Sequence, residues 1–223
     1  MLLAIDSATR LLSLALFNGD QITAESTWHS ANQHSVEIMP AVSQMLRTAG
    51  LEPNQLKAIG VAQGPGSFNG LRIGISTAKG LAMSLSIPLI GIPTLDIVAG
   101  AHPPLEGGTL IATAGVGRGR VCAANYRWMG DSWQAVSDPR IEDWAAVAAR
   151  ALAEPGAVVS GEIDSAGRDL LQAQGITLAA PIWSLRRAGV LAALAWQRLG
   201  AGDPGDPALV LPIYLHQPGV PHP

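Results

Sequence analysis

The sequence predicts an α/β protein of two lobes, each built on a mixed β-sheet flanked by helices. The order of three strands, a helix, a strand and a helix occurs twice along the 223 residues, which indicates two lobes on one plan. A stretch rich in proline and glycine separates the two copies. We therefore expect a first lobe over 1–101, a linker over 102–108 and a second lobe over 109–223, whose last helix or tail can pack back on the first lobe.

In the first half of the chain, apolar runs define the strands and apolar residues at helical spacing define the helices. Gly50 ends the first long helix, because glycine readily adopts the left-handed conformation that follows a helix. Thr94 is the predicted N-cap of a short helix. We expect strands over 2–6, 11–18, 22–28, 58–63 and 88–92, and helices over about 33–49, 69–86 and 95–101.

The same signals predict the elements of the second half. We expect strands over 109–115, 120–128, 132–136 and 157–161, and helices over 141–153, 166–174 and 185–200. The tail is rich in proline and glycine, so it is predicted to be extended, with "VLPIYL" (210–215) held against the body of the protein.

The composition limits the partners that the chain can bind directly. Charged residues make up 14% of the chain and the formal net charge is −3. Lysine and arginine are scattered, with Arg186 and Arg187 as the only adjacent pair, so the sequence carries no electrostatic footprint for nucleic acid. The single cysteine, Cys122, excludes an internal disulfide and lies in an apolar run, which favours a buried inert thiol over a nucleophile.

No targeting or membrane segment is predicted. The N-terminus "MLLAIDSATR" lacks the basic region of a signal peptide. The longest apolar run is interrupted by Pro88, Pro93 and Asp96 before it is long enough to cross a bilayer. We expect a cytoplasmic protein.

The run "AIDSAT" ends the first strand with an aspartate and small hydroxyl residues. This is the phosphate-side signature of actin-like ATPases and sugar kinases, in which a carboxylate orients metal-bound water and backbone N–H groups face phosphate oxygens. Asp6 and Thr9 match that pattern, and Ala8 stands in the place of its glycine. Asp6, Ser7 and Thr9 are therefore candidate nucleotide-binding residues, although they could simply close a strand end.

The second lobe lacks the acid that phosphoryl transfer needs. After its first strand the sequence reads "AGVGRGR", and no acidic residue lies between Glu106 and Asp131. Without a second carboxylate to help hold Mg²⁺, catalysis of that kind is not expected. A metal site is not expected either, because His29 and His34 are spaced off a shared helix face.

The stretch "GPGSFNGLRIGISTAKGLA" (64–82) contains five glycines but matches no phosphate-binding motif. It is neither a Walker A loop nor a dinucleotide fingerprint. Gly70, Gly74 and Ala78 recur every four residues, so one helix ridge has almost no side-chain bulk. Each interior glycine costs about 1 kcal/mol of helix stability relative to alanine, which close packing by another helix can offset. That neighbour is either a partner subunit or an element of the same lobe. The first alternative predicts that Gly74→Leu abolishes partner binding and leaves the fold intact.

Four stretches together resemble the TsaB (YeaZ) family. They are "LLAIDSAT", "HSVEIMPAVSQML", "GPGSFNGLRIGISTAKGLAMSLSIPLIGIPTLD" and "PIYLHQ". The resemblance is dense over 1–100, thin over 101–205, and returns at 211–217. The family's central motif runs Gly-Pro-Gly-Ser-Phe-Thr-Gly-Leu-Arg-Ile-Gly, and only Asn69 departs from it, in the place of threonine.

The resemblance implies a two-lobed actin-like (ASKHA) fold with RNase H-like lobes and a non-catalytic homologue of TsaD. TsaD, helped by TsaB and the ATPase TsaE, transfers a threonylcarbamoyl group to adenosine 37 of tRNAs that read ANN codons. The implied role is a scaffold subunit that dimerises with TsaD and activates it. Implied partners are TsaD, TsaE and, in isolation, a second copy of the chain, with tRNA reached only through the complex.

The family's dimer face is formed by the two long helices of the first lobe. Here it would comprise Val36, Met39, Ser43, Leu46, Gly70, Ile73, Gly74, Thr77, Ala78 and Leu81. Family members often carry an Asp-Ala-Arg-like run where this chain has "AGVGRGR", so any nucleotide or TsaE contact through that region is in doubt. No cofactor is expected, and weak ADP or ATP binding stays open. The alternatives are a degenerate actin-like ATPase or small-molecule kinase and, less favoured, a zinc hydrolase.

Overall fold

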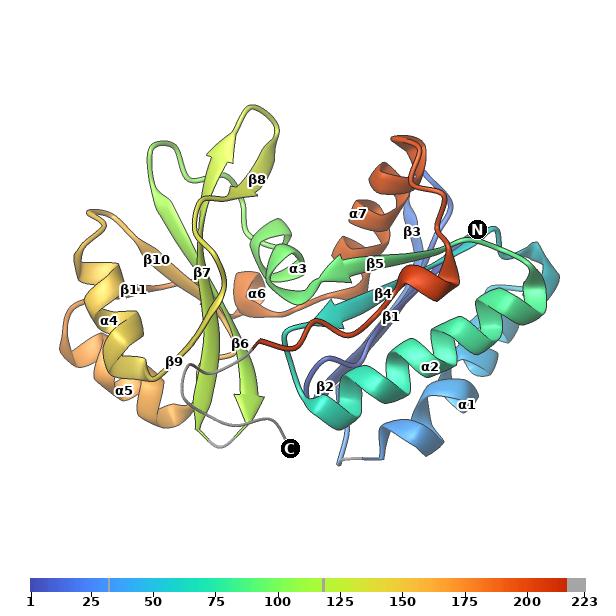
Figure 1. Cartoon of the computed structure of the whole chain (residues 1–223), viewed down its shortest axis with the longest axis horizontal. Helices are drawn as coiled ribbons and strands as arrows, with labels where there is room; N and C mark the ends of the chain where they lie inside the picture. The colour runs from blue at the N-terminus through green and yellow to red at the C-terminus, as the bar shows by residue number, and fades with distance from the viewer. Residues whose placement is uncertain (32, 118, 216–223) are drawn as a thin grey trace.

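A computed structural model describes residues 1–31, 33–117 and 119–215 of the chain. Two β-sheets form two lobes, and α3 (Thr94–Gly100) lies between them (Figure 1). The helices α1 (His34–Thr48) and α2 (Phe68–Leu85) cover the outer side of the first sheet. In the second lobe α4 (Trp144–Leu152) and α5 (Ser165–Ala173) take the equivalent place. Within the described ranges, every helix is too short or too polar to span a bilayer.

The two sheets share one topology. The first has the order β3-β2-β1-β4-β5, and the second has the order β11-β10-β6-β7-β8, with β9 paired to β7. In each, the central strand has an antiparallel neighbour on one side and a parallel neighbour on the other. The first-lobe strands are β1 (Leu2–Asp6), β2 (Leu11–Phe17), β3 (Ile22–His29), β4 (Ala58–Gly64) and β5 (Leu89–Pro93). The second-lobe strands are β6 (Thr109–Gly117), β7 (Arg120–Met129), β8 (Ser132–Ala135), β9 (Arg140–Glu142), β10 (Val158–Gly161) and β11 (Thr177–Leu178).

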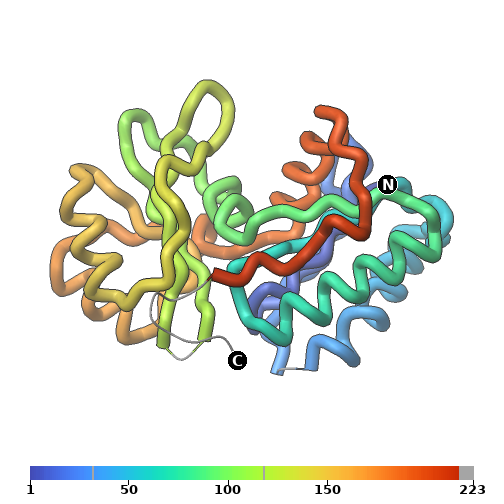
Figure 2. The backbone as a smooth tube through the Cα atoms, viewed as in Figure 1, coloured from blue at the N-terminus to red at the C-terminus, as the bar shows by residue number. Residues whose placement is uncertain are grey.

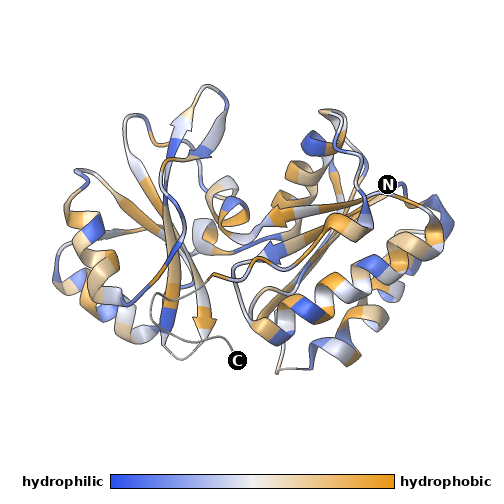
Figure 3. Cartoon of the chain, viewed as in Figure 1, coloured by the Kyte–Doolittle hydropathy of each residue, from blue (hydrophilic) through white to orange (hydrophobic). Residues whose placement is uncertain are grey.

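The central strand β1 is buried on both faces, which explains its continuous apolar sequence (Figure 3). Side chains alternate along a strand, so Leu3 and Ile5 face the core beneath α1 and α2. Leu2 and Ala4 face the opposite core, which is completed by α7 (Ala188–Gly200). The first sheet is thus covered by helices from both halves of the sequence.

The last part of the chain returns to the first lobe (Figure 2). After α6 (Pro181–Ser184) the chain enters α7, whose Leu191 and Ala195 pack on Gly60 of β4. The tail then runs along the first lobe, where Ile213 N donates to Gln63 O of β4 at 2.7 Å. This agrees with the predicted placement of "VLPIYL"; the last two residues of "PIYLHQ" lie outside the described residues. Where the chain divides into domains stays a prediction.

Several element boundaries differ from those expected. The helix predicted over 141–153 begins only at Trp144, because Ile141 and Glu142 pair with β7 as β9 and Asp143 caps the helix through Ala146 N. Thr94 is not an N-cap: it is the first residue of α3, and its buried hydroxyl has no hydrogen-bond partner among the described residues. Ser67 caps α2, because its side chain accepts from Gly70 N.

Candidate functional site

The turn between β1 and β2 brings Asp6, Ser7 and Thr9 to the boundary between the lobes. All three side chains are buried. Ala8 N donates to Asp6 Oδ1 at 3.0 Å, and Leu11 N donates to Thr9 Oγ1 at 3.2 Å, so the turn is closed by its own side chains. Ser7 Oγ donates to Gly70 O at 2.8 Å, which ties the turn to the first turn of α2.

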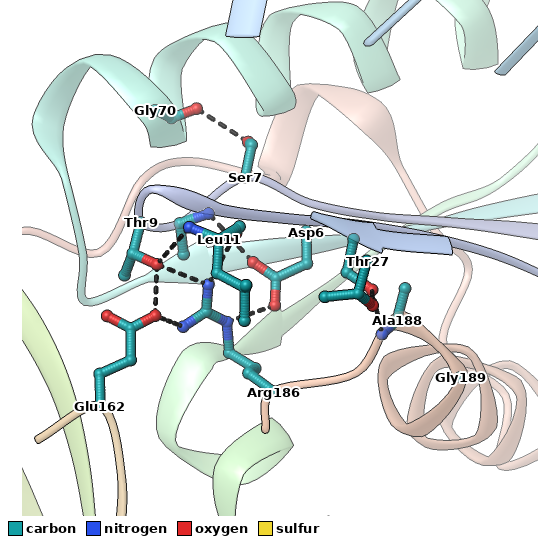
Figure 4. A network of polar contacts seen from close by, with 12 residues as sticks. Asp6, Ser7, Thr9, Leu11, Thr27, Gly70, Glu162, Arg186, Ala188 and Gly189 are labelled. Carbon is teal, nitrogen blue, oxygen red and sulfur yellow. Dashed lines mark hydrogen bonds and ion pairs between the residues drawn. The ribbon is translucent and has the colours of Figure 1, made fainter. Parts of the chain in front are cut away.

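Arg186 fills the space in front of this turn (Figure 4). It precedes α7, and its side chain is only 1% exposed. Nε donates to Asp6 Oδ2 at 2.5 Å, and Nη2 donates to Thr9 Oγ1 at 2.9 Å and to Leu11 O at 3.2 Å. The guanidinium therefore meets three acceptors of the β1–β2 turn in its own plane.

Glu162 brings the second lobe into the same network. It follows β10, and its Oε1 accepts from Arg186 Nη1 at 2.7 Å and from the Thr9 hydroxyl (Figure 4). We call Asp6, Thr9, Glu162 and Arg186 the interlobe network. The neighbouring Arg187 adopts an extended backbone, with φ −117° and ψ 133°, and its side chain pairs instead with Glu25. Of the two adjacent arginines, one is thus internal and the other is half-exposed.

The charges of the interlobe network stabilise one another. Burial by itself disfavours the charged form of Arg186, but the carboxylates of Asp6 and Glu162 outweigh that effect and raise the pKa of the guanidinium above its ordinary value. Removing Arg186 would leave the buried carboxylate of Asp6 unpaired, which is far less favourable than the complete set. The network is therefore expected to hold the two lobes in one arrangement.

This geometry argues against nucleotide binding by Asp6, Ser7 and Thr9, which stays a prediction. Both Asp6 oxygens are engaged within the chain, one by Ala8 N and the other by Arg186. A carboxylate in that state is not free to orient metal-bound water. The residues that would receive a metal–nucleotide in an actin-like ATPase do not fit one here.

Sequence reasoning missed Arg186 and Glu162. An acid was sought after the first strand of the second lobe, whereas Glu162 follows β10. The Arg186–Arg187 pair was noticed, but neither its burial nor its partner can be read from spacing: Arg186 and Asp6 are 180 positions apart. A polar Gly-Glu step directly after an apolar strand, in "AVVSGE", is the only local signal that Glu162 offered.

Two further predicted features have internal roles. His34 is buried, and its Nε2 hydrogen-bonds the carbonyl of Thr9 at 2.8 Å, so it supports the same turn. Cys122 is fully buried, and burial, reinforced by Glu142, raises the pKa of its thiol to about 12. Both observations agree with structural roles.

The helices α1 and α2 present a second surface. On α1 the exposed residues Val36, Met39 and Ser43 follow a spacing of three and four, and Val36 is 64% exposed. On α2 Ile73 and Thr77 are half-buried and Gly80 is exposed. With the half-buried Leu81, these residues make up what we call the α1–α2 face: Val36, Met39, Ser43, Ile73, Thr77, Gly80 and Leu81.

The other predicted interface residues point into the first lobe. Leu46 and Ala78 belong to its hydrophobic core. A Cβ built on Gly70 would collide with the Ser7 carbonyl, and one built on Gly74 would collide with the Ser7 hydroxyl. Both distances would be shorter than 3.0 Å, a separation below which real Cβ atoms essentially never approach another atom. The small-residue ridge therefore admits the β1–β2 turn of the same chain. Gly70, Gly74, Ala78 and Leu46 thus pack within the chain, and their contact with a partner stays a prediction. The Ser7 hydroxyl leaves no room for a side chain at Gly74, which contradicts the expectation that Gly74→Leu leaves the fold intact.

Comparison with known proteins identifies the family to which the chain belongs. The model of the TsaD family, described as tRNA N6-adenosine threonylcarbamoyltransferase, matches residues 22–175. The chain belongs to the TsaD family. The tRNA threonylcarbamoyladenosine biosynthesis protein TsaB of Escherichia coli (strain K12) is 36% identical over 147 residues, which are 63% of this chain and 63% of that protein. The match thus spans less than two thirds of this relative.

Solved structures agree with the fold. YeaZ from Pseudomonas aeruginosa superposes with a TM-score of 0.77 at 23% identity, over 96% of this chain and 99% of that one. The ADPNP-bound activator of the 2-hydroxyisocaproyl-CoA dehydratase from Clostridium difficile superposes with a TM-score of 0.51 at 13% identity, over 89% of this chain and 94% of that one. The predicted resemblance to the TsaB (YeaZ) family and the predicted two-lobed actin-like fold are confirmed.

Proposed function

We propose that this chain is a non-catalytic accessory subunit for threonylcarbamoyl transfer to adenosine 37 of tRNAs reading ANN codons, and that it acts by pairing its α1–α2 face with TsaD. Family membership and the similarity to TsaB support the reaction in which it takes part. The observation that carries the accessory role is the engagement of Asp6 by the buried Arg186.

The interlobe network supports a scaffold rather than a catalyst. An actin-like ATPase needs its first-strand carboxylate free for the metal–phosphate. In this chain that carboxylate is paired with an internal cation, and Glu162 of the second lobe is paired with the same cation. Asp6 was the residue that favoured a degenerate ATPase or kinase, and its pairing with Arg186 removes that support. The geometry of the described residues therefore favours the accessory role.

The α1–α2 face supports pairing with a related subunit. Val36 and Met39 are large apolar side chains left exposed on α1, as is common at protein–protein interfaces. Gly80 lies on the same outward stripe of α2 as Ile73 and Thr77, and a Cβ there would meet nothing within 4 Å. Packing within the chain thus offers no reason for this helix glycine, whereas the close approach of a second helix does.

The α1–α2 face is proposed to bind two partners in different states. TsaD occupies it in the complex, and a second copy of the chain occupies it in isolation. TsaE joins the assembled pair, and tRNA is reached only through the complex, because the chain is net negative and its arginines are scattered. The site of action is the cytoplasm.

The proposal is tested by Met39→Asp, with Leu152→Asp on the exposed side of α4 as the matched control. Both residues are exposed apolar side chains on helices, so neither change should disturb the core. Variants are expressed in cells depleted of the native protein, co-purification with TsaD is measured, and tRNA nucleosides are analysed by mass spectrometry. We expect Met39→Asp to lose both TsaD and threonylcarbamoyladenosine, and Leu152→Asp to keep both.

Two results would contradict the proposal at different points. Undiminished co-purification of folded Met39→Asp would refute the interface. Depleted cells that retain threonylcarbamoyladenosine would refute the function itself. A thermal unfolding curve for each variant shows that the comparison is made between folded proteins.

A further inference from the structure

A concave site lies between the lobes, and it is lined by none of the four residues of the interlobe network. It is a cavity of about 630 Å³ between α7 and the β7–β8 hairpin, with α3 at its floor. Figure 1 shows these three elements facing one another at the top of the molecule. The volume lies in the range of small-ligand sites, and such sites are common where two lobes meet.

One wall of the cavity is aromatic. Trp128 and Trp133 are a cross-strand pair of the β7–β8 hairpin, and their rings are 5.7 Å apart in an edge-to-face arrangement. Trp133 Nε1 donates to the His102 carbonyl at 2.9 Å, which fixes the orientation of its ring. Two half-buried indoles that line a cavity offer π faces, to which cations are attracted.

The unpaired charges in the cavity are negative. Arg187 and Arg198 also line it, but each is neutralised, by Glu25 and Asp203 respectively. Asp131, in the hairpin turn, is exposed and has no ion-pair partner among the described residues.

Asp96 of α3 also lines the cavity, and it has no ion-pair partner in the described part of the chain. Its carboxylate accepts from the Tyr126 hydroxyl at 2.6 Å. Burial raises the pKa of Asp96, a cost that the Tyr126 hydrogen bond and the more distant Arg198 reduce only in part. A cation bound beside this carboxylate would offset the remaining cost of burying its negative charge.

We propose that this cavity binds an alkylammonium or guanidinium group, held by the indoles of Trp128 and Trp133 and by the carboxylates of Asp96 and Asp131. The group belongs either to a free amine or to a lysine or arginine side chain of a partner protein. An anionic ligand is disfavoured, because each arginine in the cavity is already paired. The site is independent of the α1–α2 face and of the proposed function.

The test measures binding to the isolated full chain by calorimetry and tryptophan fluorescence. The probes are spermidine, the peptide acetyl-Gly-Arg-Gly-amide and its neutral isostere acetyl-Gly-citrulline-Gly-amide. We expect saturable binding of spermidine, of the arginine peptide or of both, with the citrulline peptide at least about tenfold weaker, as expected for charge-assisted and cation–π contacts. Binding of spermidine alone identifies a free amine as the source, and binding of the peptide identifies a partner side chain.

Substitutions of the residues that line the cavity test whether the probes bind there. Asp131→Asn lies in an exposed turn that tolerates asparagine, and Asp96→Asn keeps an acceptor for Tyr126. Each is expected to weaken binding by about fivefold or more, and Trp128→Leu to abolish the fluorescence change. Asp169→Asn, an exposed acid on α5, is the matched control and should bind like the native chain.

Three outcomes would overturn the proposal. They are no saturable binding of either cationic probe, equal affinity for the arginine and citrulline peptides, or native affinity in Asp131→Asn and Trp128→Leu together. Because no TsaD is present in the assay, a failed pairing with TsaD leaves these results unaffected.

Discussion

Arg186 Nε lies 2.5 Å from Asp6 Oδ2, although the two residues are 180 positions apart and belong to opposite ends of the chain. The contact is buried, and Glu162 extends it to the second lobe. In this fold the end of the first strand normally faces a metal-bound phosphate. Here an internal guanidinium occupies that position, so the lobes are joined by a group that cannot be released or hydrolysed.

Arg186→Leu is expected to destabilise the protein strongly. The substitution leaves the buried carboxylate of Asp6 without its cation, which typically costs about 3–5 kcal/mol. Chemical denaturation of the purified variant measures the loss as a lower midpoint. Arg187→Leu is the control, because the ion pair of Arg187 with Glu25 is half-exposed and such pairs contribute about 1 kcal/mol or less. Equal midpoints for the two variants would show that the interlobe network does not hold the lobes together.

Gly74→Ala is expected to destabilise the isolated chain, since the new Cβ would collide with the Ser7 hydroxyl. Overpacking of this kind typically costs about 1–3 kcal/mol. The Ser7→Ala background removes the colliding oxygen, so the cost of Gly74→Ala measured there should be smaller. A double-mutant cycle of unfolding free energies gives the coupling, and strict additivity would contradict the packing described for α2.

Gly80→Ala, in contrast, is expected to stabilise the isolated chain. Its Cβ would meet nothing, so the helix gains up to about 1 kcal/mol in the isolated chain. A loss of stability in Gly80→Ala would place this residue against the protein's own chain and would remove it from the α1–α2 face.

Stability is expected to fall as the pH rises from about 9 to 12. The folded protein holds the Cys122 proton up to a pKa of about 12, whereas the unfolded thiol ionises near 9.0. Between these values the unfolded state binds fewer protons, so alkali favours unfolding by about 1.4 kcal/mol per pH unit from this group. Urea unfolding at pH 8 and pH 10 should show a smaller decrease in Cys122→Ala than in the native chain. Equal decreases in the two proteins would mean that the thiol is not shielded.

The regular part of the fold could be predicted from sequence because its signals are local. The apolar run before Asp6 and the helical spacing from Val36 to Leu46 each depend on near neighbours in the chain. The strand β9 was missed for the opposite reason: Arg140–Glu142 is short and polar, and only its pairing with β7 makes it a strand. Its two last residues were therefore assigned to the helix that follows.

The site was predicted less well because its contacts are long-range. The small-residue ridge at Gly70 and Gly74 correctly indicated that something packs closely, but the pattern cannot say which element does so. The same limit applies to Asp6: its place at a strand end was apparent, whereas the arginine that neutralises it comes from the loop before α7. Gly80 lies outside that ridge, and its open surroundings leave room for an external neighbour.

The return of α7 to the first sheet has a consequence for synthesis on the ribosome. Leu2 and Ala4 are translated long before α7, the helix that shields them. The nascent first lobe must therefore wait, with one apolar side uncovered, while the whole second lobe is translated. Transiently exposed apolar surface of this kind makes an intermediate prone to aggregation until α7 covers it.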